Sequence, residues 1–397
     1  MGNIVADEDA HFSGVERDRR WARVRALMAH DRLDVILAVP HTGHHDHFSA
    51  YSRYLTGLGG FSFEVGAVFP REGQVTAFVV PDVAPEKWRA QQDWVGDIRT
   101  SGRAFGDGII DRLRELGITR PRIGLAGLAG VPRFADGIVA HGFYEKLRQS
   151  FPDASLSDCT SLLDLARYTK GPEEIEFLRR SVAQAEAAIA AMKAKARPGI
   201  AETAVYAAML SAMIEHGSEI PAMIMWSAGP PERLVSAGPP TSRRFAAGDF
   251  IRIEVEGRCA GYCGQVTQMA VLGPVPPSYR EMWRVQQEAL ALCCDLARPG
   301  VALGELAAKT EAVAEGTSCR IRFLMHGRGV GDDAPMYVFF ADEQTKRWVL
   351  EENASFIIKP VVTREGHTQV VWGDSVIITA AGAQRLGSLT PEIIELM

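Results

Sequence analysis

The densest cluster of side chains that could hold a metal ion lies near the N-terminus. The segment His41-Thr-Gly-His-His-Asp-His47 places four imidazoles and Asp46 within seven residues. Imidazole nitrogens and carboxylate oxygens are common ligands of zinc and copper. Because such tight spacing rarely lets every side chain reach one ion, we do not predict a native metal site in this segment.

Reactive side chains also stand singly farther along the chain. His326 could transfer protons, since an unperturbed imidazole titrates near pH ~6.5. Lys359 could act as a base or an amine nucleophile if the fold removed it from water. Cys263 is more simply explained as a small buried side chain. The glycine-rich run Gly327-Arg-Gly-Val-Gly331 lacks the strand-to-helix context of a dinucleotide loop, so no dinucleotide is expected.

The composition limits the class of protein and its partners. The chain has 397 residues, of which 43 are Lys or Arg and 49 are Asp or Glu, for a formal net charge of −6. An acidic balance argues against nucleic-acid binding. The six cysteines show no CxxC zinc spacing, and we find neither a run of ~18 apolar residues nor a signal-peptide core. We expect a cytoplasmic protein with reduced thiols, no cofactor, and neither a nucleic acid nor a membrane as partner.

Residues 1–165 are predicted to form an α/β domain with mixed strands and covering helices. Apolar spacing predicts helices over residues 15–30 and 105–116. Buried strands are expected at residues 34–40, 65–69, 74–80 and 122–126.

A second domain is predicted over residues 166–397. Pro172 suits the first turn of a long helix that ends before Pro198. The segment Ala196-Arg-Pro-Gly-Ile200 recurs as Ala297-Arg-Pro-Gly-Val301, with a helix on either side in both copies. We therefore predict duplicated α+β halves related by a pseudo-twofold axis. Two inward-facing sheets around a pocket are expected from strands at residues 249–256, 356–362, 368–372 and 375–379.

Six motifs, spread in order over nearly the whole chain, carry a resemblance to a known family. They are Tyr51-Ser-Arg-Tyr-Leu-Thr-Gly57, Lys170-Gly-Pro-Glu-Glu-Ile175, the stretch from Ala247-Gly-Asp249 to Gly261-Tyr-Cys263, His326-Gly-Arg-Gly329, Phe356-Ile-Ile-Lys-Pro360 and Leu389-Thr-Pro391. Together they resemble the creatinase/aminopeptidase P/prolidase family (M24, pita-bread fold). The resemblance implies a creatinase-like N-terminal domain, a C-terminal pita-bread domain, and a homodimer.

The resemblance also implies where a two-metal centre would lie, and this chain departs from that pattern. The metallopeptidase members use two Asp, one His and two Glu as ligands. The two Asp positions hold Glu254 and Gln265, while the His is kept as His326. The two Glu positions hold Lys359 and, within one residue, Gly373. We therefore predict that this site binds no metal.

The charges at the altered positions predict a salt bridge instead. Two divalent cations need a dense set of hard ligands, whereas Lys359 brings an ammonium to a carboxylate position. An ammonium offers no lone pair and repels a metal ion. We predict that Lys359 fills part of the metal space and pairs with Glu254, a pair that tolerates burial only while both partners remain.

The resemblance suggests further residues around a substrate. In dimeric relatives the loop before the Tyr-Leu-Thr-Gly turn reaches a pocket, which would bring His44 and His47 to the substrate. Arg53 would then clamp a carboxylate, with a surface ion pair as the alternative. The predicted catalytic residues are His326, Glu254 and Lys359, and the predicted substrate-binding residues are Gln265, Arg53, His44, His47, Asp333, Trp226 and Cys263.

We interpret the sequence as a metal-independent, creatinase-like enzyme. It would hydrolyse or eliminate at a C–N bond of a small amino-acid-like or carboxylated substrate, with His326 moving the proton. A guanidinium substrate is disfavoured because it would face Lys359, a like charge. The alternatives are a lyase or cyclase of a specialised biosynthetic pathway, a non-catalytic small-molecule or peptide-binding module, and a Xaa-Pro metallopeptidase with substitute ligands.

Overall fold

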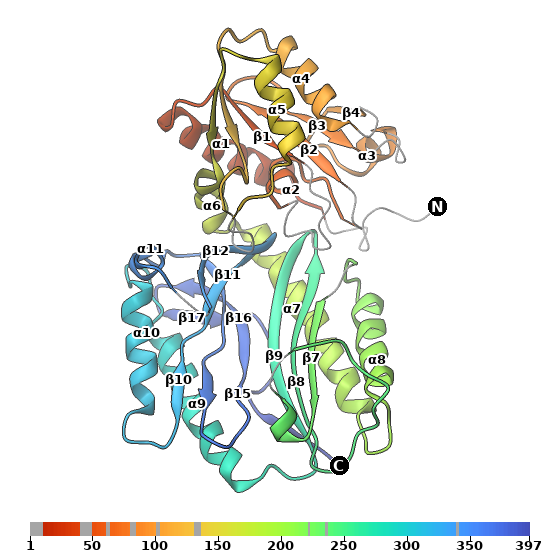
Figure 1. Cartoon of the computed structure of the whole chain (residues 1–397), viewed down its shortest axis with the longest axis vertical. Coiled ribbons are helices and arrows are strands. Elements are labelled where there is room, and N and C mark those ends of the chain that lie inside the picture. The colour runs from red at the N-terminus through yellow and green to blue at the C-terminus, as the bar shows by residue number, and fades with distance from the viewer. Residues whose placement is uncertain are drawn as a thin grey trace. The chain divides into compact units, whose positions relative to one another are not determined.

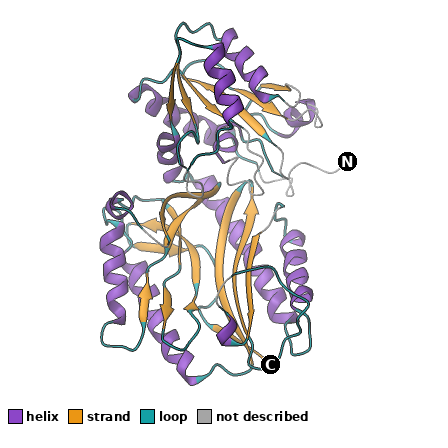
Figure 2. Ribbon diagram, viewed as in Figure 1, coloured by secondary structure: helices purple, strands orange, loops and turns teal. Residues whose placement is uncertain are grey.

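The computed structural model of the chain describes residues 11–39, 50–60, 64–79, 85–100, 104–130, 136–220, 223–234, 237–338 and 341–397. The chain divides into two units, the first comprising Met1–Tyr168 with Val330–Ala334 and the second comprising Thr169–Gly329 with Pro335–Met397. Figure 1 labels the helices and strands, and Figure 2 separates them by colour. Helix α6 (Thr160–Tyr168) runs through the predicted boundary at residue 165.

The first unit is built on a six-stranded sheet with the order β4-β3-β2-β1-β5-β6. The central strand β1 is antiparallel to β2 and parallel to β5, so the sheet is mixed. Val35 and Leu37 of β1 pack with Ile109 of α4 and Leu147 of α5 in one apolar cluster. The elements before α6 are α1 (Gly14–His30), β1 (Val35–Ala38), α2 (Ala50–Thr56), β2 (Val65–Pro70), β3 (Thr76–Val79), α3 (Pro85–Gln91), β4 (Asp97–Thr100), α4 (Phe105–Glu115), β5 (Arg122–Leu125), α5 (His141–Ser150) and β6 (Ser155–Asp158).

The second unit contains the two helix pairs that the repeated Ala-Arg-Pro-Gly segment predicts. Pro172 stands at the start of α7 (Pro172–Lys195), which packs with α8 (Glu202–Glu215). The second pair is α9 (Pro277–Leu296) and α10 (Leu303–Glu311). The remaining elements are β7 (Met223–Gly229), η2 (Pro231–Arg233), β8 (Phe250–Cys259), β9 (Tyr262–Leu272), η3 (Ala312–Ala314), β10 (Arg320–Arg322), β11 (Met325–Gly329), β12 (Gly331–Tyr337), α11 (Glu343–Arg347), β13 (Ser355–Ile358), β14 (Val361–Thr363), β15 (Val370–Val371), β16 (Gly373–Thr379), β17 (Gly382–Arg385) and β18 (Ile393–Leu396).

One large sheet replaces the two inward-facing sheets that we expected. Its nine strands include the path β12-β11-β13-β16-β9-β8-β7, with β17 paired to β16 and β18 paired to β9. The two halves join where β16 pairs with β9, at Gly373 opposite Thr267. The expectation of two separate sheets was therefore wrong, because the strands of both halves share one continuous hydrogen-bonded ladder.

The predicted strand over residues 356–362 is divided between two sheets. β13 ends at Ile358 within the large sheet, and β14 begins at Val361 in a three-stranded sheet with the order β10-β14-β15. Pro360 has no N–H to donate to a ladder, which explains the break. Lys359 lies at this break, and its backbone N–H donates to the carbonyl oxygen of Leu324 at 3.0 Å.

The register of β8 and β9 sorts their side chains onto two faces. Glu254 lies opposite Thr267 and Glu256 lies opposite Gln265, so these four residues share one face of the sheet. Helix α7 covers the other face, where a Cβ atom on Gly264 would lie 2.6 Å from the Ser181 hydroxyl. Only glycine permits that close approach, so the polar face of β8 and β9 is turned away from α7.

Candidate active site

Lys359 and Glu254 form the centre of the polar face. The Lys359 Nζ atom lies 2.5 Å from Glu254 Oε2, which is the predicted ion pair. Nζ also donates to Gln265 Oε1 at 3.2 Å. The Lys359 side chain is 4% exposed and that of Glu254 is 26% exposed. An ammonium carries three N–H donors, and within the described residues the third has no acceptor.

Gln265 holds the Glu254 carboxylate in place. Its Nε2 atom lies 3.3 Å from Glu254 Oε2 and 3.0 Å from Glu256 Oε1, while its Oε1 atom accepts from Lys359. These three contacts fix the orientation of the amide, because only the NH2 end can face two carboxylates. Gln265 and Lys359 both donate to Glu254 Oε2, so Glu254 Oε1 has no hydrogen-bond donor within the described residues.

The carboxylate of Glu254 stays ionised despite its burial. Burial raises the pKa of Glu254, but the positive charge and hydrogen bond of Lys359, with a further contribution from His326, lower it below the usual value. Glu256 opposes this shift as a nearby like charge. Glu254 is therefore an anion and a hydrogen-bond acceptor at neutral pH.

His326 lies on the same face as these groups. On β11 it stands opposite Ile357 of β13, which in turn stands opposite Ser375 of β16. The His326 Nδ1 atom is 3.4 Å from the carbonyl oxygen of Gly327. In the neutral tautomer that carries its proton on Nδ1, this atom donates to the Gly327 oxygen and Nε2 is the basic nitrogen.

A second buried ion pair lies beside the first and was missed in the sequence. Arg328 is fully buried, and its Nη1 atom lies 3.1 Å from Glu256 Oε1. Its Nε atom donates to the carbonyl oxygen of Cys263 at 3.1 Å. The signal was present, because alternation along β8 puts Glu256 on the face of Glu254. A bulky cation inside the run His326-Gly-Arg-Gly329 also needs a buried partner.

The face around Gly373 does not provide a carboxylate. Gly373 lies opposite Thr267, on the polar face, but a Cβ atom there would overlap the Cβ atom of Lys359. Asp374 lies on the opposite face, where it pairs with Arg385 at 3.0 Å. The Thr267 hydroxyl is buried and makes no hydrogen bond within the described residues. The register therefore excludes Asp374 as a substitute ligand beside Glu254.

These residues do not fit the two-metal centre that the family resemblance implies. The Lys359 ammonium occupies Glu254 Oε2 and Gln265 Oε1, two acceptor atoms that a metal ion would need. An amide and an ammonium are poor substitutes for two carboxylates. In the part of the chain that the structure describes, no group of three or more His, Cys, Asp or Glu side chains is placed to hold a metal ion.

The structure corrects the placement of Trp226. This residue lies opposite Ile253 of β8, and so on the face away from Glu254. It is 2% exposed, and its Nε1 atom donates to Glu202 Oε2 at 3.2 Å. Trp226 is a core side chain and does not line the Glu254 face. The residue opposite Glu254 is Met225, which is 40% exposed and which the sequence did not single out.

The other predicted substrate-binding residues are scattered. Cys263 is fully buried on β9, two positions before Gln265 and therefore on the same face of the sheet, and its role remains a prediction. Arg53 is 5% exposed in the first unit, so it does not lie at the surface, and its predicted role in clamping a carboxylate remains a prediction. Asp333 is 2% exposed and forms an ion pair with Arg167, also in the first unit. His44 and His47 lie outside the described residues, and their roles and that of Asp333 remain predictions.

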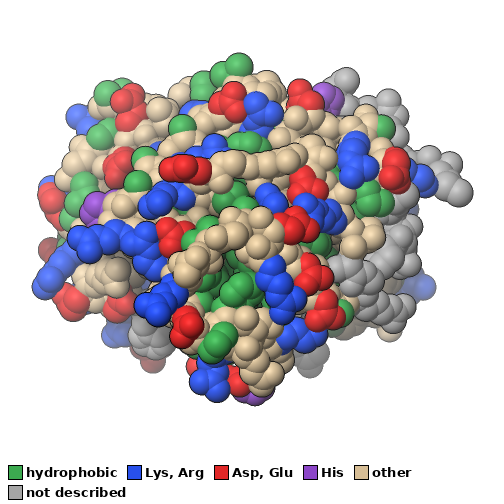
Figure 3. Space-filling view, turned by 90° about the horizontal axis from the view of Figure 1, so that it is seen from above, with side chains coloured by type: hydrophobic (Ala, Val, Ile, Leu, Met, Phe, Trp, Pro, Cys, Tyr) green, Lys and Arg blue, Asp and Glu red, His purple; other side chains and the backbone are tan. Residues whose placement is uncertain are grey.

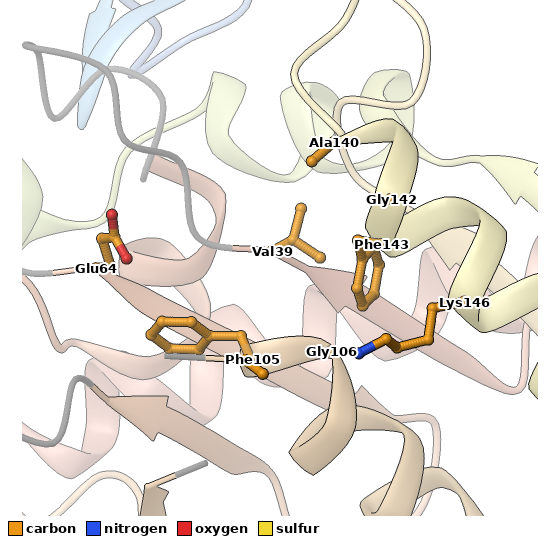
Figure 4. Close-up of a pocket in the computed structure, with 9 residues that line it drawn as sticks. Val39, Glu64, Phe105, Gly106, Ala140, Gly142, Phe143 and Lys146 are labelled. Carbon is orange, nitrogen blue, oxygen red and sulfur yellow. The ribbon is translucent and has the colours of Figure 1, made fainter. Parts of the chain in front are cut away.

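A pocket of about 260 Å³ lies in the first unit, at the starts of α4 and α5. Figure 4 shows Phe105, Phe143 and Val39 on its walls, with Glu64 and Lys146 at its sides. The Lys146 ammonium is 2.6 Å from Asp107. This pocket therefore offers mainly apolar walls.

On the face of the molecule shown in Figure 3, acidic and basic side chains are interspersed. No helix in the described residues is long and apolar enough to cross a membrane.

Comparison with family models defines the class of protein. Residues 20–169 match the Creatinase/Prolidase N-terminal domain, and residues 176–380 match metallopeptidase family M24. The chain belongs to metallopeptidase family M24. This confirms the family resemblance and the predicted fold class, a creatinase-like α/β domain followed by a pita-bread domain.

Among the relatives is the Xaa-Pro dipeptidase of Lactobacillus helveticus, 26% identical over 254 residues that make up 62% of this chain and 66% of that enzyme. The dimethylsulfoniopropionate lyase DddP of Roseobacter denitrificans is 24% identical over 272 residues, 65% of this chain and 60% of that protein. The X-Pro aminopeptidase of Thermotoga maritima has a similar structure, with a TM-score of 0.76, 18% identity, and coverage of 94% of this chain and 99% of that one.

Proposed function

We propose that this chain is a metal-independent enzyme that acts at a C–N bond of a small carboxylated or amino-acid-like substrate. Lys359 is the observation that supports the proposal. Its ammonium is held by Glu254 and Gln265 and keeps one N–H donor without an acceptor in the described residues. A buried cation held in this way can stabilise an oxygen that gains negative charge during a reaction.

The contacts of the three central residues support a proposed role for each. In a hydrolysis, His326 removes a proton from a water molecule as the water oxygen bonds to the substrate carbon. The C–N bond breaks, and His326 returns the proton to the departing nitrogen. Glu254 Oε1 accepts a hydrogen bond that orients the water or the substrate N–H, and Lys359 donates to the substrate oxygen. In an elimination, the proton that His326 removes comes from the carbon beside the C–N bond.

Two relatives favour neighbouring reactions. The name of the Lactobacillus helveticus relative supports a Xaa-Pro dipeptidase as the second candidate. The lyase name of the Roseobacter denitrificans relative supports elimination over hydrolysis. A dipeptidase reaction of the metal-dependent kind would need ligands that Lys359 and Gly373 do not supply. We also propose a cytoplasmic homodimer, whose stoichiometry sedimentation equilibrium would measure.

Metal content and turnover together test the proposed function. Untagged protein purified without chelator is assayed by plasma mass spectrometry before and after incubation with Mn²⁺ or Zn²⁺ and desalting. Amides, amidines and amines that carry a carboxylate, and Xaa-Pro dipeptides, are then tested with EDTA and with Mn²⁺. We expect less than about a tenth of an equivalent of metal, and turnover in EDTA that His326→Ala abolishes.

One or two tightly held equivalents of metal, with Xaa-Pro cleavage only after Mn²⁺ loading, would overturn the proposal and establish the second candidate. A His44→Ala/His47→Ala double variant is the matched control. If it loses the metal while turnover in EDTA remains, the metal belongs to the N-terminal histidine cluster.

A further inference from the structure

A row of four paired residues runs across the polar face of the large sheet. Met225 of β7 lies opposite Glu254 of β8, Glu254 lies opposite Thr267 of β9, and Thr267 lies opposite Gly373 of β16. The exposed fraction falls along this row, from 40% at Met225 and 26% for the Glu254 side chain to 0% at Thr267. Among these residues, the face is therefore accessible at its β7 end and closed at its β16 end.

Lys359 reaches Glu254 from the closed end of the row. A Cβ atom on Gly373 would overlap the Cβ atom of Lys359, so the lysine side chain starts beside β16. Its Nζ atom ends at Oε2 of Glu254. A substrate oxygen that accepts the remaining N–H of Lys359 must therefore lie beside Glu254 as well. The rest of the substrate extends toward Met225, because the opposite end of the row is filled.

Two methionines form the accessible end of the polar face. Met223 and Met225 are two positions apart on β7, so they share the side of the strand that is turned to Glu256 and Glu254. Met223 is half-buried, and β7 is the last strand in the path of the sheet. Thioether side chains are apolar and flexible, so they adapt to apolar groups of different shapes. A single exposed apolar residue is ordinary, but here two stand together beside a buried ion pair.

We propose that Met223 and Met225 bind an apolar substituent of the substrate, while Lys359 and Glu254 bind the atoms at the C–N bond. The proposal deepens the proposed function and rests on it, because it names the substrate class as an N-acylated amino acid with an apolar acyl group. Neighbouring strands lie ~5 Å apart, so the apolar group lies within a few bonds of the amide. Its removal from water favours binding without any further charged contact.

N-Acylglycines of increasing acyl length are suitable probes, because only their apolar part changes. Binding of acetylglycine, butyrylglycine and hexanoylglycine to the full chain, after treatment with chelator and desalting, is measured by calorimetry and by saturation-transfer NMR. Each fully buried methylene group strengthens binding about fourfold. Because the methionine surface is open on one side, we expect the affinity to rise about tenfold or more from acetylglycine to hexanoylglycine.

Substitutions at Met225 test whether this residue causes the gain in affinity with acyl length. Met225→Gln keeps the length of the side chain but makes it polar, so we expect the gain from acetylglycine to hexanoylglycine to fall below about threefold. Met225→Leu stays apolar and should keep most of the gain. Ile214→Gln, at an isoleucine 48% exposed on α8, is the matched control and should keep all of it.

Three results would overturn the proposal. The first is an affinity of the wild type that does not depend on acyl length, which includes no binding of any of the three probes. The second is a gain that Met225→Gln keeps in full. The third is a Met225→Gln variant that sediments as a monomer where the wild type is a dimer, because the methionine would then contact a second copy of the chain.

The same measurements separate this proposal from the proposed function. His326→Ala is expected to show the same gain in affinity with acyl length while losing turnover. A gain that depends on Met225, in a protein with no metal-free turnover, would leave the apolar site standing and remove the proposed reaction. Metal-free turnover of the three probes, with a kcat/KM that depends neither on acyl length nor on Met225, would do the reverse.

Discussion

A Cβ atom on Gly373 would overlap the Cβ atom of Lys359 and lie 2.6 Å from the carbonyl oxygen of Ile358. The lysine and the glycine therefore depend on each other, although Gly373 belongs to β16 and Lys359 lies between β13 and β14. Any side chain at position 373 would displace Lys359, and with it the contacts of Glu254 and Gln265. The family's metal-binding pattern thus cannot return by changing residue 373 alone.

Gly373→Ala is expected to destabilise the second unit. The added methyl group meets backbone atoms that cannot rotate away, so we expect a loss of about 2 kcal/mol or more in the free energy of unfolding. Urea unfolding followed by circular dichroism measures the loss. The matched control is Gly238→Ala, where a Cβ atom would meet no atom of the described residues within 4 Å. Equal free energies of unfolding for the two variants would show that the atoms around Lys359 can move to admit a methyl group at little cost.

Lys359→Met is expected to cost about 2 kcal/mol, because it leaves the Glu254 carboxylate without its cation. The loss should shrink in the Lys359→Met/Glu254→Gln double variant, which removes both charges. A double-mutant cycle in urea measures the coupling between the two sites. Since the pKa of Glu254 lies below the usual value, the stabilisation is present at neutral pH and is lost as the pH falls through that lowered pKa. Additive losses at pH 7 would argue against the pair.

Gln265→Glu should place a third carboxylate between Glu254 and Glu256, which Gln265 joins at 3.3 Å and 3.0 Å. Repulsion raises the pKa of such a group, so the variant is expected to lose stability as the pH rises. Its melting temperature, relative to the wild type, should be lower at pH 8 than at pH 5. Gln287→Glu on α9 provides the same substitution away from this face. A decrease in melting temperature, relative to the wild type, that is equal at pH 5 and pH 8 would contradict repulsion among the carboxylates.

Asp374 should make stability depend on pH between about 4 and 6. Burial raises its pKa to about 6, against the opposing charge of Arg385. The folded state therefore holds a proton that the unfolded state releases near pH 3.8, and stability falls by roughly 2–3 kcal/mol as the pH rises through this window. Asp374→Asn should remove this slope, whatever it does to the overall stability. Asp111→Asn, at an exposed residue, should keep it.

Much of the fold could be predicted from the sequence, because the local patterns of the chain agree with its tertiary structure. Pro172 begins α7, and the repeated Ala-Arg-Pro-Gly segments follow the first helix of each pair. The Lys359–Glu254 pair was also predictable, because the family resemblance puts both residues at ligand positions of one metal centre, where opposite charges would pair. What local patterns could not give is the ladder between β9 and β16, which joins residues far apart in the chain.

The faces of the strands explain the remaining errors at the site. Trp226 and Met225 are neighbours in sequence and point to opposite sides of β7, so the side turned to Glu254 follows from the pairing with β8. Its aromatic side chain suggested Trp226 as a substrate-binding residue, but the strand register places Met225 on the face of Glu254. Arg328 was missed for a similar reason, since its partner Glu256 lies on a strand distant in sequence.

Strand β9 is buried along its whole length and is hydrogen-bonded to β8, β16 and β18. Its backbone amides are consequently expected to be among the last in the chain to exchange with deuterated water, because they open only when the surrounding sheet opens. Gln265 and Thr267 belong to this strand. A ligand that binds at the polar face would therefore contact side chains on a strand that is already rigid. Its binding would cost little conformational entropy of the protein.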